Sequence, residues 1–434
     1  MVRFLLKLGV MVWVLAGVGS AMGMVVTPGV SVGVGYDDNI QFAASEPKSD
    51  WFTSLTAECK LRAGPYARRL SLYSRAVYDY YWEQRPYTRM TTLAAGGRYD
   101  YFRSRTTRLR LSYDFLMTYN PEEETTSGGL VRVLDTYTRR YSHRLLVSFL
   151  HRFNPGELVD MRYSVNYTYT DDPTRQRAVY HRAELELRQR LGVDYFWGGI
   201  LTLIHDDYET SPDINRGRIT LRLGRDWGPR FEVFVAGGVE LVRSQSAEQT
   251  LANARDYDIY TLSSGFLWRA GPKLTLEGMV GYSRVSGSGM YNAAAGSGYP
   301  VASVSLRYKG RHWVGSVSVF STLEEYDYLG EDTGLTATRR LSLRWDGWLA
   351  RHWHLGVYGD YIYDDYKQSS IAPGASQGDV ATMRVGTVVF WQVEKNWRLG
   401  FDGRYVERDG EVDSEDRHKF RGMVWVNRAL PMRW

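Results

Sequence analysis

Residues 161–170 read Met-Arg-Tyr-Ser-Val-Asn-Tyr-Thr-Tyr-Thr. The odd positions are apolar or aromatic, whereas the even positions carry Arg, Ser, Asn and Thr. Successive side chains of a strand point to opposite faces, so this two-residue period gives one apolar face and one polar face. Similar segments recur along the whole chain, with Tyr, Trp, Leu and Val on one side and Arg on the other. The repetition predicts an all-β fold, a transmembrane antiparallel up-and-down β-barrel whose apolar face meets lipid.

The first 23 residues have the layout of a secretory signal peptide. Two cations precede an apolar run over residues 8–18, and small residues follow. Cleavage is expected after Ala21 or Gly23. A signal anchor is the alternative, but the run is short for a membrane span of about 20 residues. We therefore expect a signal peptide over residues 1–23 and an exported barrel over residues 24–434.

Composition narrows the class of protein further. The net charge is +5, and of the 54 basic residues eight are Lys and the other 46 are Arg. These cations are spread along the expected strands instead of forming one patch, which argues against nucleic acid as a partner. Mean hydropathy is −0.38, as expected of a barrel in which every second residue is polar. The single Cys59 excludes an intramolecular disulfide.

The connections between the expected strands are alternately short and long. The short ones contain turn-forming Gly, Pro or Asn and include residues 63–66, 154–157, 227–229, 270–272 and 394–396. The long ones are polar and include residues 37–50, 121–129, 244–255, 286–298, 328–334 and 368–378. Outer-membrane barrels have short periplasmic turns and longer outer loops. The pattern therefore predicts which rim faces the periplasm.

We expect about 20 strands, an even number that brings both termini to the periplasmic side. The count falls to 16 or 18 if faint segments such as residues 29–36 and 91–101 do not span. The expected strands cover residues 29–36, 51–62, 69–83, 91–101, 107–119, 140–152, 158–170, 177–190, 194–207, 215–226, 230–243, 257–269, 273–284, 299–309, 312–323, 335–347, 352–366, 379–392, 396–408 and 417–430.

The carboxyl terminus carries a separate pattern. Counting back by twos, Trp434 is preceded by Met432 and Leu430. A terminal aromatic residue after alternating apolar residues resembles the signal by which outer-membrane barrels reach their insertion machinery, although Arg428 and Pro431 depart from it. We expect Trp434, Met432 and Leu430 to form an assembly signal.

The start of the expected barrel carries a family resemblance. The chain reads Gly35-Tyr36-Asp37-Asp38-Asn39-Ile40 and then Ser49-Asp50-Trp51-Phe52-Thr53-Ser54-Leu55. This resembles the opening of the putative β-barrel porin 2 family of outer-membrane proteins, in which a Tyr-x-Asp-Asn strand end precedes Ser-Asp and a hydrophobic strand. Thr56-Ala57-Glu58 replaces the Pro-Gly-Leu often found in the second strand. The resemblance implies a role in exopolysaccharide synthesis and export.

Catalytic and metal-binding patterns are weak. His205-Asp206-Asp207 lies at the end of an expected strand, where a polar loop edge is the favoured interpretation over a protease-like pair. Asp364-Asp365 and Asp171-Asp172 are adjacent pairs, so their side chains point to opposite faces and do not converge on a cation. We expect no enzyme activity, no catalytic residue, no cofactor and no metal site.

The polar face carries a ladder of arginines. The pore-lining candidates are Arg108, Arg110, Arg182, Arg188, Arg190, Arg216, Arg218, Arg222, Arg340, Arg344, Arg398 and Arg404. Acidic residues share this face: Asp114, Glu184, Glu186, Asp226, Asp346 and Asp402. One interpretation is a cross-strand salt-bridge lattice that stiffens the wall; the other is a lumen tuned to anions. Inward Tyr73, Tyr81 and Tyr358 are candidates for stacking on sugar rings.

Three functions remain open at this stage. The first is a porin-like conduit for exopolysaccharide export across a Gram-negative outer membrane, working with periplasmic export proteins. The second is a diffusion porin for uptake of small anionic solutes, and the third is a structural or adhesive surface barrel. The expected partners are outer-membrane lipid, the barrel insertion machinery and an anionic polysaccharide or solute.

Overall fold

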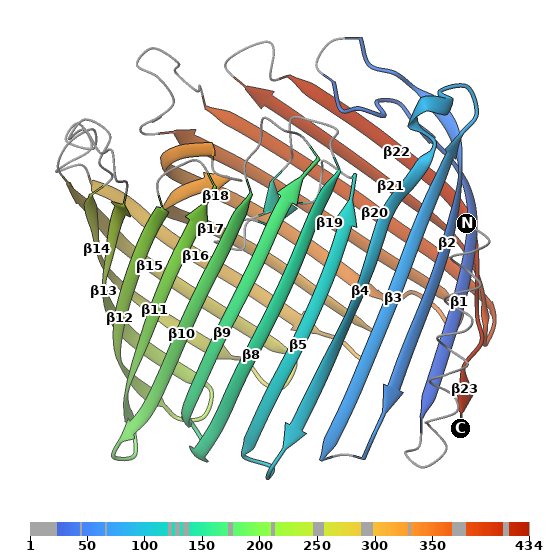
Figure 1. The fold of residues 1–434 in the computed structure, drawn as a ribbon. Helices are drawn as coiled ribbons and strands as arrows, with labels where there is room; N and C mark the ends of the chain where they lie inside the picture. The colour runs from blue at the N-terminus through green and yellow to red at the C-terminus, as the bar shows by residue number, and fades with distance from the viewer. Residues whose placement is uncertain are drawn as a thin grey trace.

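The computed structural model describes residues 24–43, 46–65, 67–119, 124–125, 131–132, 139–171, 177–209, 213–245, 256–287, 298–328, 331–366, 379–410 and 416–433. They form one large antiparallel sheet (Figure 1). Its strands are β1 (Val25–Asp37), β2 (Asp50–Ala63), β3 (Arg68–Tyr81), β4 (Arg89–Phe102), β5 (Thr107–Thr118), β8 (Arg140–Asn154), β9 (Glu157–Thr170), β10 (Ala178–Leu191), β11 (Tyr195–Tyr208), β12 (Asp213–Trp227), β13 (Phe231–Gln245), β14 (Tyr257–Arg269), β15 (Leu274–Gly287), β16 (Gly298–Lys309), β17 (Trp313–Tyr328), β18 (Glu331–Trp348), β19 (Trp353–Tyr366), β20 (Val380–Glu394), β21 (Trp397–Gly410), β22 (Arg417–Ala429) and β23 (Met432–Arg433).

The sheet closes on itself into a barrel. Each strand pairs with its neighbours in chain order, and β1 pairs with both β2 and β22. The two-residue β23 resumes the pairing with β1 after Pro431, so the 21 strands of the sheet amount to twenty that cross the wall. This confirms the expected all-β barrel of about 20 strands. The faint segments 29–36 and 91–101 lie within β1 and β4 and belong to the wall.

The two rims differ as expected, with one exception. Short turns join the strands at the lower rim of Figure 1, where the carboxyl end also lies. Residues 328–334 are not the long connection predicted, because β17 runs to Tyr328 and β18 starts at Glu331. These strands are longer than the expected 312–323 and 335–347 because their pairing continues to Tyr328↔Glu331. Outside the main sheet lie the short pair β6 (Glu124–Thr125) and β7 (Val131–Arg132), and the 3-10 turn η2 (Arg85–Tyr87).

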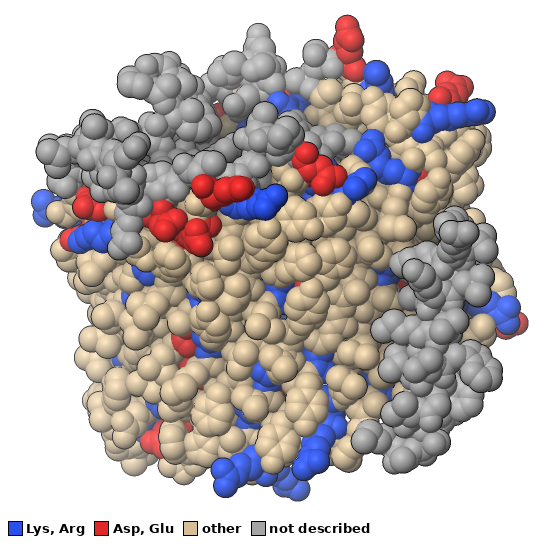
Figure 2. Space-filling model, in the orientation of Figure 1, with Lys and Arg blue, Asp and Glu red and all other residues tan. Residues whose placement is uncertain are grey.

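The outer face of the wall is apolar. In β9, Met161 and Tyr163 are 48% and 44% exposed, as expected for the face that meets lipid. Figure 2 shows charged side chains mainly along the two rims, with a mostly uncharged band between them. Aromatic pairs stand near the ends of the strands, such as Trp51 with Trp82 and Trp353 with Trp391, as in the aromatic girdles of membrane barrels. No helix among the described residues is long and apolar enough to cross a membrane.

A buried polar network joins the first and last strands on the inner face. Asp37 accepts hydrogen bonds from the hydroxyl of Tyr81 at 3.1 Å and pairs with the ammonium of Lys419 at 3.4 Å. Asp79 accepts a hydrogen bond from Arg421 at 2.6 Å. Both carboxyl side chains are fully buried. The network therefore links β1 and β3 to β22, across the seam where the barrel closes.

The rest of the opening motif fixes the first loop to the last strand. The Asn39 amide donates to the carbonyls of Ala43 and His418, both at 2.9 Å. Asp38 accepts the backbone N–H of Phe420 at 2.6 Å, and its own N–H donates to the carbonyl of that residue. Three residues of the motif that carries the family resemblance, Asp37, Asp38 and Asn39, are therefore seam residues.

We predict that Asp79→Ala destabilises the barrel by about 3–5 kcal/mol, because it leaves the Arg421 guanidinium without its buried partner. Samples are heated to increasing temperatures and then run on a detergent gel without boiling. The temperature at which the compact, fast-migrating form disappears measures the loss of stability. Asp194→Ala is the control, since Asp194 is half exposed and lies 3.9 Å from Arg225 in a surface turn. Equal effects of the two substitutions would contradict the seam's role.

Candidate functional site

The predicted pore-lining arginines point into the barrel. Arg108 and Arg110 alternate with Leu109 and Leu111, which are 42% and 47% exposed on the outer face. The same alternation holds in the other strands that carry the predicted arginines. The structure thus places these side chains on the inner face, while their role in transport stays a prediction.

Part of the ladder is a lattice of ion pairs. Glu232 accepts hydrogen bonds from Arg188 at 3.0 Å and from Arg222 at 2.7 Å. Asp360 accepts from Arg340 at 2.6 Å. Further inner-face pairs are Arg110–Asp100, Arg162–Asp160, Arg182–Glu184, Arg190–Asp226, Arg216–Asp206, Arg218–Glu240, Arg384–Asp360 and Arg404–Asp402. The lattice interpretation therefore describes mainly β9–β13 and β18–β21, with the further pair Arg110–Asp100 between β5 and β4.

The lattice is layered. Its carboxylates lie against the wall, as the 2% exposure of the Glu232 side chain shows. The guanidinium groups reach further out: the Arg218 side chain is 46% exposed, whereas its partner Glu240 is 10% exposed. An arginine stem is long enough to cover a buried carboxylate and still reach water. Even the paired strands thus present mainly positive groups to the interior.

Three predicted arginines lie outside the lattice. Arg108 and Arg344 form no ion pair within the described residues, and the Arg108 Nε atom is buried without a hydrogen-bond partner there. The Arg398 guanidinium lies 5.1 Å from the centre of the Phe390 ring. These three contribute charge that no described carboxylate neutralises.

Several arginines of the inner face are absent from the predicted set, and four of them lie close together on neighbouring strands. Arg62, Arg75, Arg98 and Arg144 lie on β2, β3, β4 and β8, and all four are exposed. None forms an ion pair within the part of the chain that the structure describes. We call these four residues the basic wall. Their inward direction follows from the same two-residue period, so the sequence held a signal for them.

The three inward tyrosines differ in what they can contact. Tyr73 is 38% exposed and donates a hydrogen bond from its hydroxyl to Asp114 at 2.8 Å. Tyr358 is half-buried and lies against Gly386. Tyr81 is only 1% exposed and belongs to the seam network. The prediction that Tyr81 stacks on sugar is therefore wrong, because its ring packs against Phe52 and Ile40.

One hairpin leaves the wall at the rim of the long loops. The pairing of β16 with β17 ends at Ala302↔Ser321, whereas β17 continues to Tyr328. The free part of β17 therefore has only β18 as a partner, and a register shift between Tyr326 and Asp327 interrupts that pairing. On the other side, the pairing of β18 with β19 ends at Thr336↔Tyr366. Beyond Glu324↔Thr336 the hairpin is therefore two-stranded and can bend away from the sheet.

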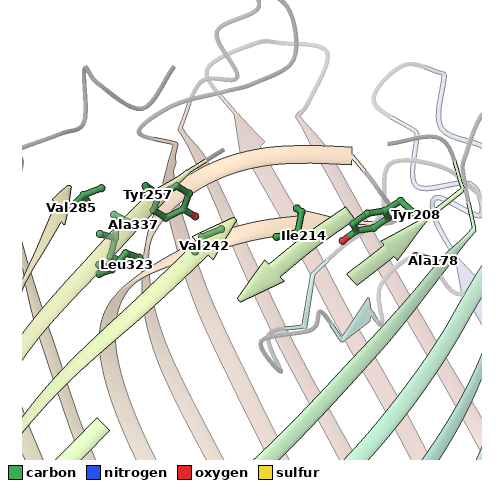
Figure 3. Packing of buried hydrophobic residues seen from close by; sticks show 9 residues of the cluster. Ala178, Tyr208, Ile214, Val242, Tyr257, Val285, Leu323 and Ala337 are labelled. Atoms are coloured by element: carbon green, nitrogen blue, oxygen red, sulfur yellow. The ribbon is translucent and has the colours of Figure 1, made fainter. Parts of the chain in front are cut away.

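The hairpin packs on the inner face of distant strands. Leu323 and Ala337 are buried in one apolar cluster with Ile214, Val242 and Tyr257 of β12, β13 and β14 (Figure 3). These three residues belong to the inner face of the wall. In the part of β17 that also pairs with β16, the alternate residues in step with Leu323 face outward. The end of the hairpin has therefore folded over the rim into the interior.

The remaining predicted features are placed as follows. The Leu430 N–H donates to the carbonyl of Pro28 at 2.9 Å, and Met432 pairs with Val26 of β1. Trp434 lies outside the described residues, as does the signal peptide at residues 1–23, and both functions stay predictions. His205 bonds Asn215, whereas Asp206 on the opposite face pairs with Arg216.

The fold and the charged interior define a porin-like β-barrel of a Gram-negative outer membrane. The family model described as putative beta-barrel porin 2 matches residues 16–195, which confirms the resemblance found in the opening motif. No curated protein matches the chain.

Three solved structures with a similar outline are the following. The siderophore receptor PiuA from Acinetobacter baumannii is 9% identical, with a TM-score of 0.49 over 94% of this chain and 82% of that chain. OccK2 (OpdF) from Pseudomonas aeruginosa is 11% identical, with a TM-score of 0.41 over 94% and 98%. The alcaligin receptor FauA from Bordetella pertussis is 11% identical, with a TM-score of 0.46 over 94% and 76%.

We predict that Leu323→Asp raises the single-channel conductance of the purified barrel. A carboxylate cannot stay in the apolar cluster, so the hairpin end is expected to leave the interior and widen the path. Leu323→Met is the control, because it keeps an apolar side chain of similar volume. Unchanged conductance in the Asp variant would contradict a narrowing role of the hairpin.

Proposed function

We propose that this protein is an outer-membrane conduit for export of an acidic exopolysaccharide. The observation that carries the proposal is the basic wall, four exposed guanidinium groups on the inner face without a described carboxylate partner. The layered lattice on the other strands adds guanidinium groups that cover their carboxylates. Rings of Arg or Lys favour anions in pores. The family resemblance to exopolysaccharide systems supports the same direction of transport.

The mechanism requires no bond making. A polymer with negative charges would enter from the periplasmic rim and exchange its water and counterions for contacts with arginines. Most inward guanidinium groups on β9–β13, and several on β18–β21, are already engaged by carboxylates, which limits how tightly each of these can hold a passing anion. Contacts that are favourable for entry but individually weak allow the polymer to leave.

Uptake of small anionic solutes is the second candidate, because the same charges favour any anion. A deletion strain separates the two functions. Export predicts that the strain loses its surface polysaccharide and accumulates polymer in the periplasm. Normal surface polysaccharide in the deletion strain would exclude the export function and leave the uptake porin.

We predict that the purified barrel prefers anions in planar bilayers under a salt gradient. Replacing the basic wall with glutamine should move the anion-to-cation permeability ratio toward one, since no described carboxylate shares those charges. The control replaces four exposed arginines of the short turns, Arg103, Arg105, Arg311 and Arg351. This control should shift the permeability ratio less, because these four charges lie in the turns and not on the inner face of the barrel. A barrel that prefers cations would contradict the proposal.

A further inference from the structure

Tyr73 differs from the other two predicted inward tyrosines, Tyr81 and Tyr358, because it is exposed. It pairs in register with Gly96 of β4. A Cβ atom added to Gly96 would lie 2.6 Å from the Tyr73 Cε1 atom. The ring therefore lies directly over the glycine backbone, in space that any other side chain would occupy. One face of the ring is covered by the wall.

The other face of the ring is open to the interior. Tyr73 is 38% exposed, although its hydroxyl is held by Asp114 at 2.8 Å. The hydrogen bond and the glycine together fix the ring in one orientation. An exposed, immobilised aromatic face inside a polar lumen buries apolar surface only when a ligand covers it.

The basic wall surrounds this ring. Arg75 lies two residues along β3, about 7 Å away on the same face. Arg62 and Arg98 both pair with Ser71, which stands two residues to the other side. Arg144 lies on β8, opposite Asp114 of β5 in the strand register. Unpaired guanidinium groups therefore stand on both sides of the ring.

We propose that Tyr73 and the basic wall form a binding subsite for an anionic sugar residue, a pyranose that carries a carboxylate. The apolar C–H face of the pyranose would stack on the open face of Tyr73. The carboxylate would then meet the guanidinium groups of Arg62 and Arg98, whose planar donors suit that group. This proposal rests on the proposed export of an acidic polysaccharide. It specifies the sugar unit that the basic wall and Tyr73 bind.

The nearest carboxylates do not neutralise the positive charge of the basic wall. Glu58 pairs with Lys60 at 3.2 Å, and Asp114 is held by the tyrosine hydroxyl. Asp100 is engaged by Arg110 at 2.8 Å. Glu58 and Asp100 thus have cationic partners, whereas Asp114 is bound by a neutral hydroxyl and keeps its charge. The four arginines of the basic wall outnumber this single carboxylate.

The test is a calorimetric titration of the purified barrel in detergent with an oligogalacturonate. Tyr73→Leu should weaken binding about tenfold, the loss expected for one stacking contact. Tyr73→Phe should lose less, because it keeps the ring. The matched control is Tyr99→Leu, since Tyr99 on the adjacent strand is also 38% exposed but faces outward. It should bind as the native barrel does.

Two other probes separate recognition of the sugar ring from recognition of negative charge. A neutral maltooligosaccharide of the same length should bind more weakly and respond less to loss of Arg62 and Arg98. Inorganic polyphosphate should respond to those arginines but not to Tyr73. Native affinity for oligogalacturonate in Tyr73→Leu would overturn the subsite, as would equal dependence of polyphosphate on Tyr73. Binding is measured without current, so a barrel that binds but does not conduct would contradict only the conduit.

Discussion

Closure of the sheet is the constraint on which the rest of this structure depends. Hydrocarbon offers no partner to a backbone N–H or C=O group, so a sheet in a membrane cannot keep free edges. Here the edges meet where β1 pairs with β22. The polar network at this seam joins Arg421 to Asp79, which are 342 positions apart in the chain. Its buried charges are matched within the protein, which makes the joint specific to these two edges.

Closure also decides where the charges go. Because the outer face must be apolar where it meets lipid, the charged residues in the middle of the spanning strands lie on the inner face, whereas outer-face charges such as Arg225 and Arg243 stand near strand ends. A buried carboxylate is costly unless a cation accompanies it, and arginine supplies that cation while its head stays in water. On β9–β13 this gives pairs such as Arg218 with Glu240. On β2–β8 acidic residues are fewer, and the arginines of the basic wall remain unpaired.

Most of the fold could be predicted from the sequence because one period controls both the strand and its faces. The alternation in residues 161–170 predicts β9 and also the outward direction of Met161. Pairing within the lattice is not predictable in this way, since each partner depends on the register between strands. The seam and the fold-over of Leu323 also escaped prediction. Both bring together segments that are distant in the chain, and no local pattern encodes such contacts.

The inward hairpin and the basic wall occupy different parts of the interior. The hairpin packs beside β12, β13 and β14, where the inner face near the rim is apolar. The basic wall lies on β2, β3, β4 and β8, on strands that the hairpin cluster does not include. Among the described elements, the hairpin therefore takes up space on one side and leaves the charged side open. A polymer that avoids the hairpin would be brought toward Tyr73 and the basic wall. In the proposed function, the hairpin would thus both narrow the path and increase its selectivity.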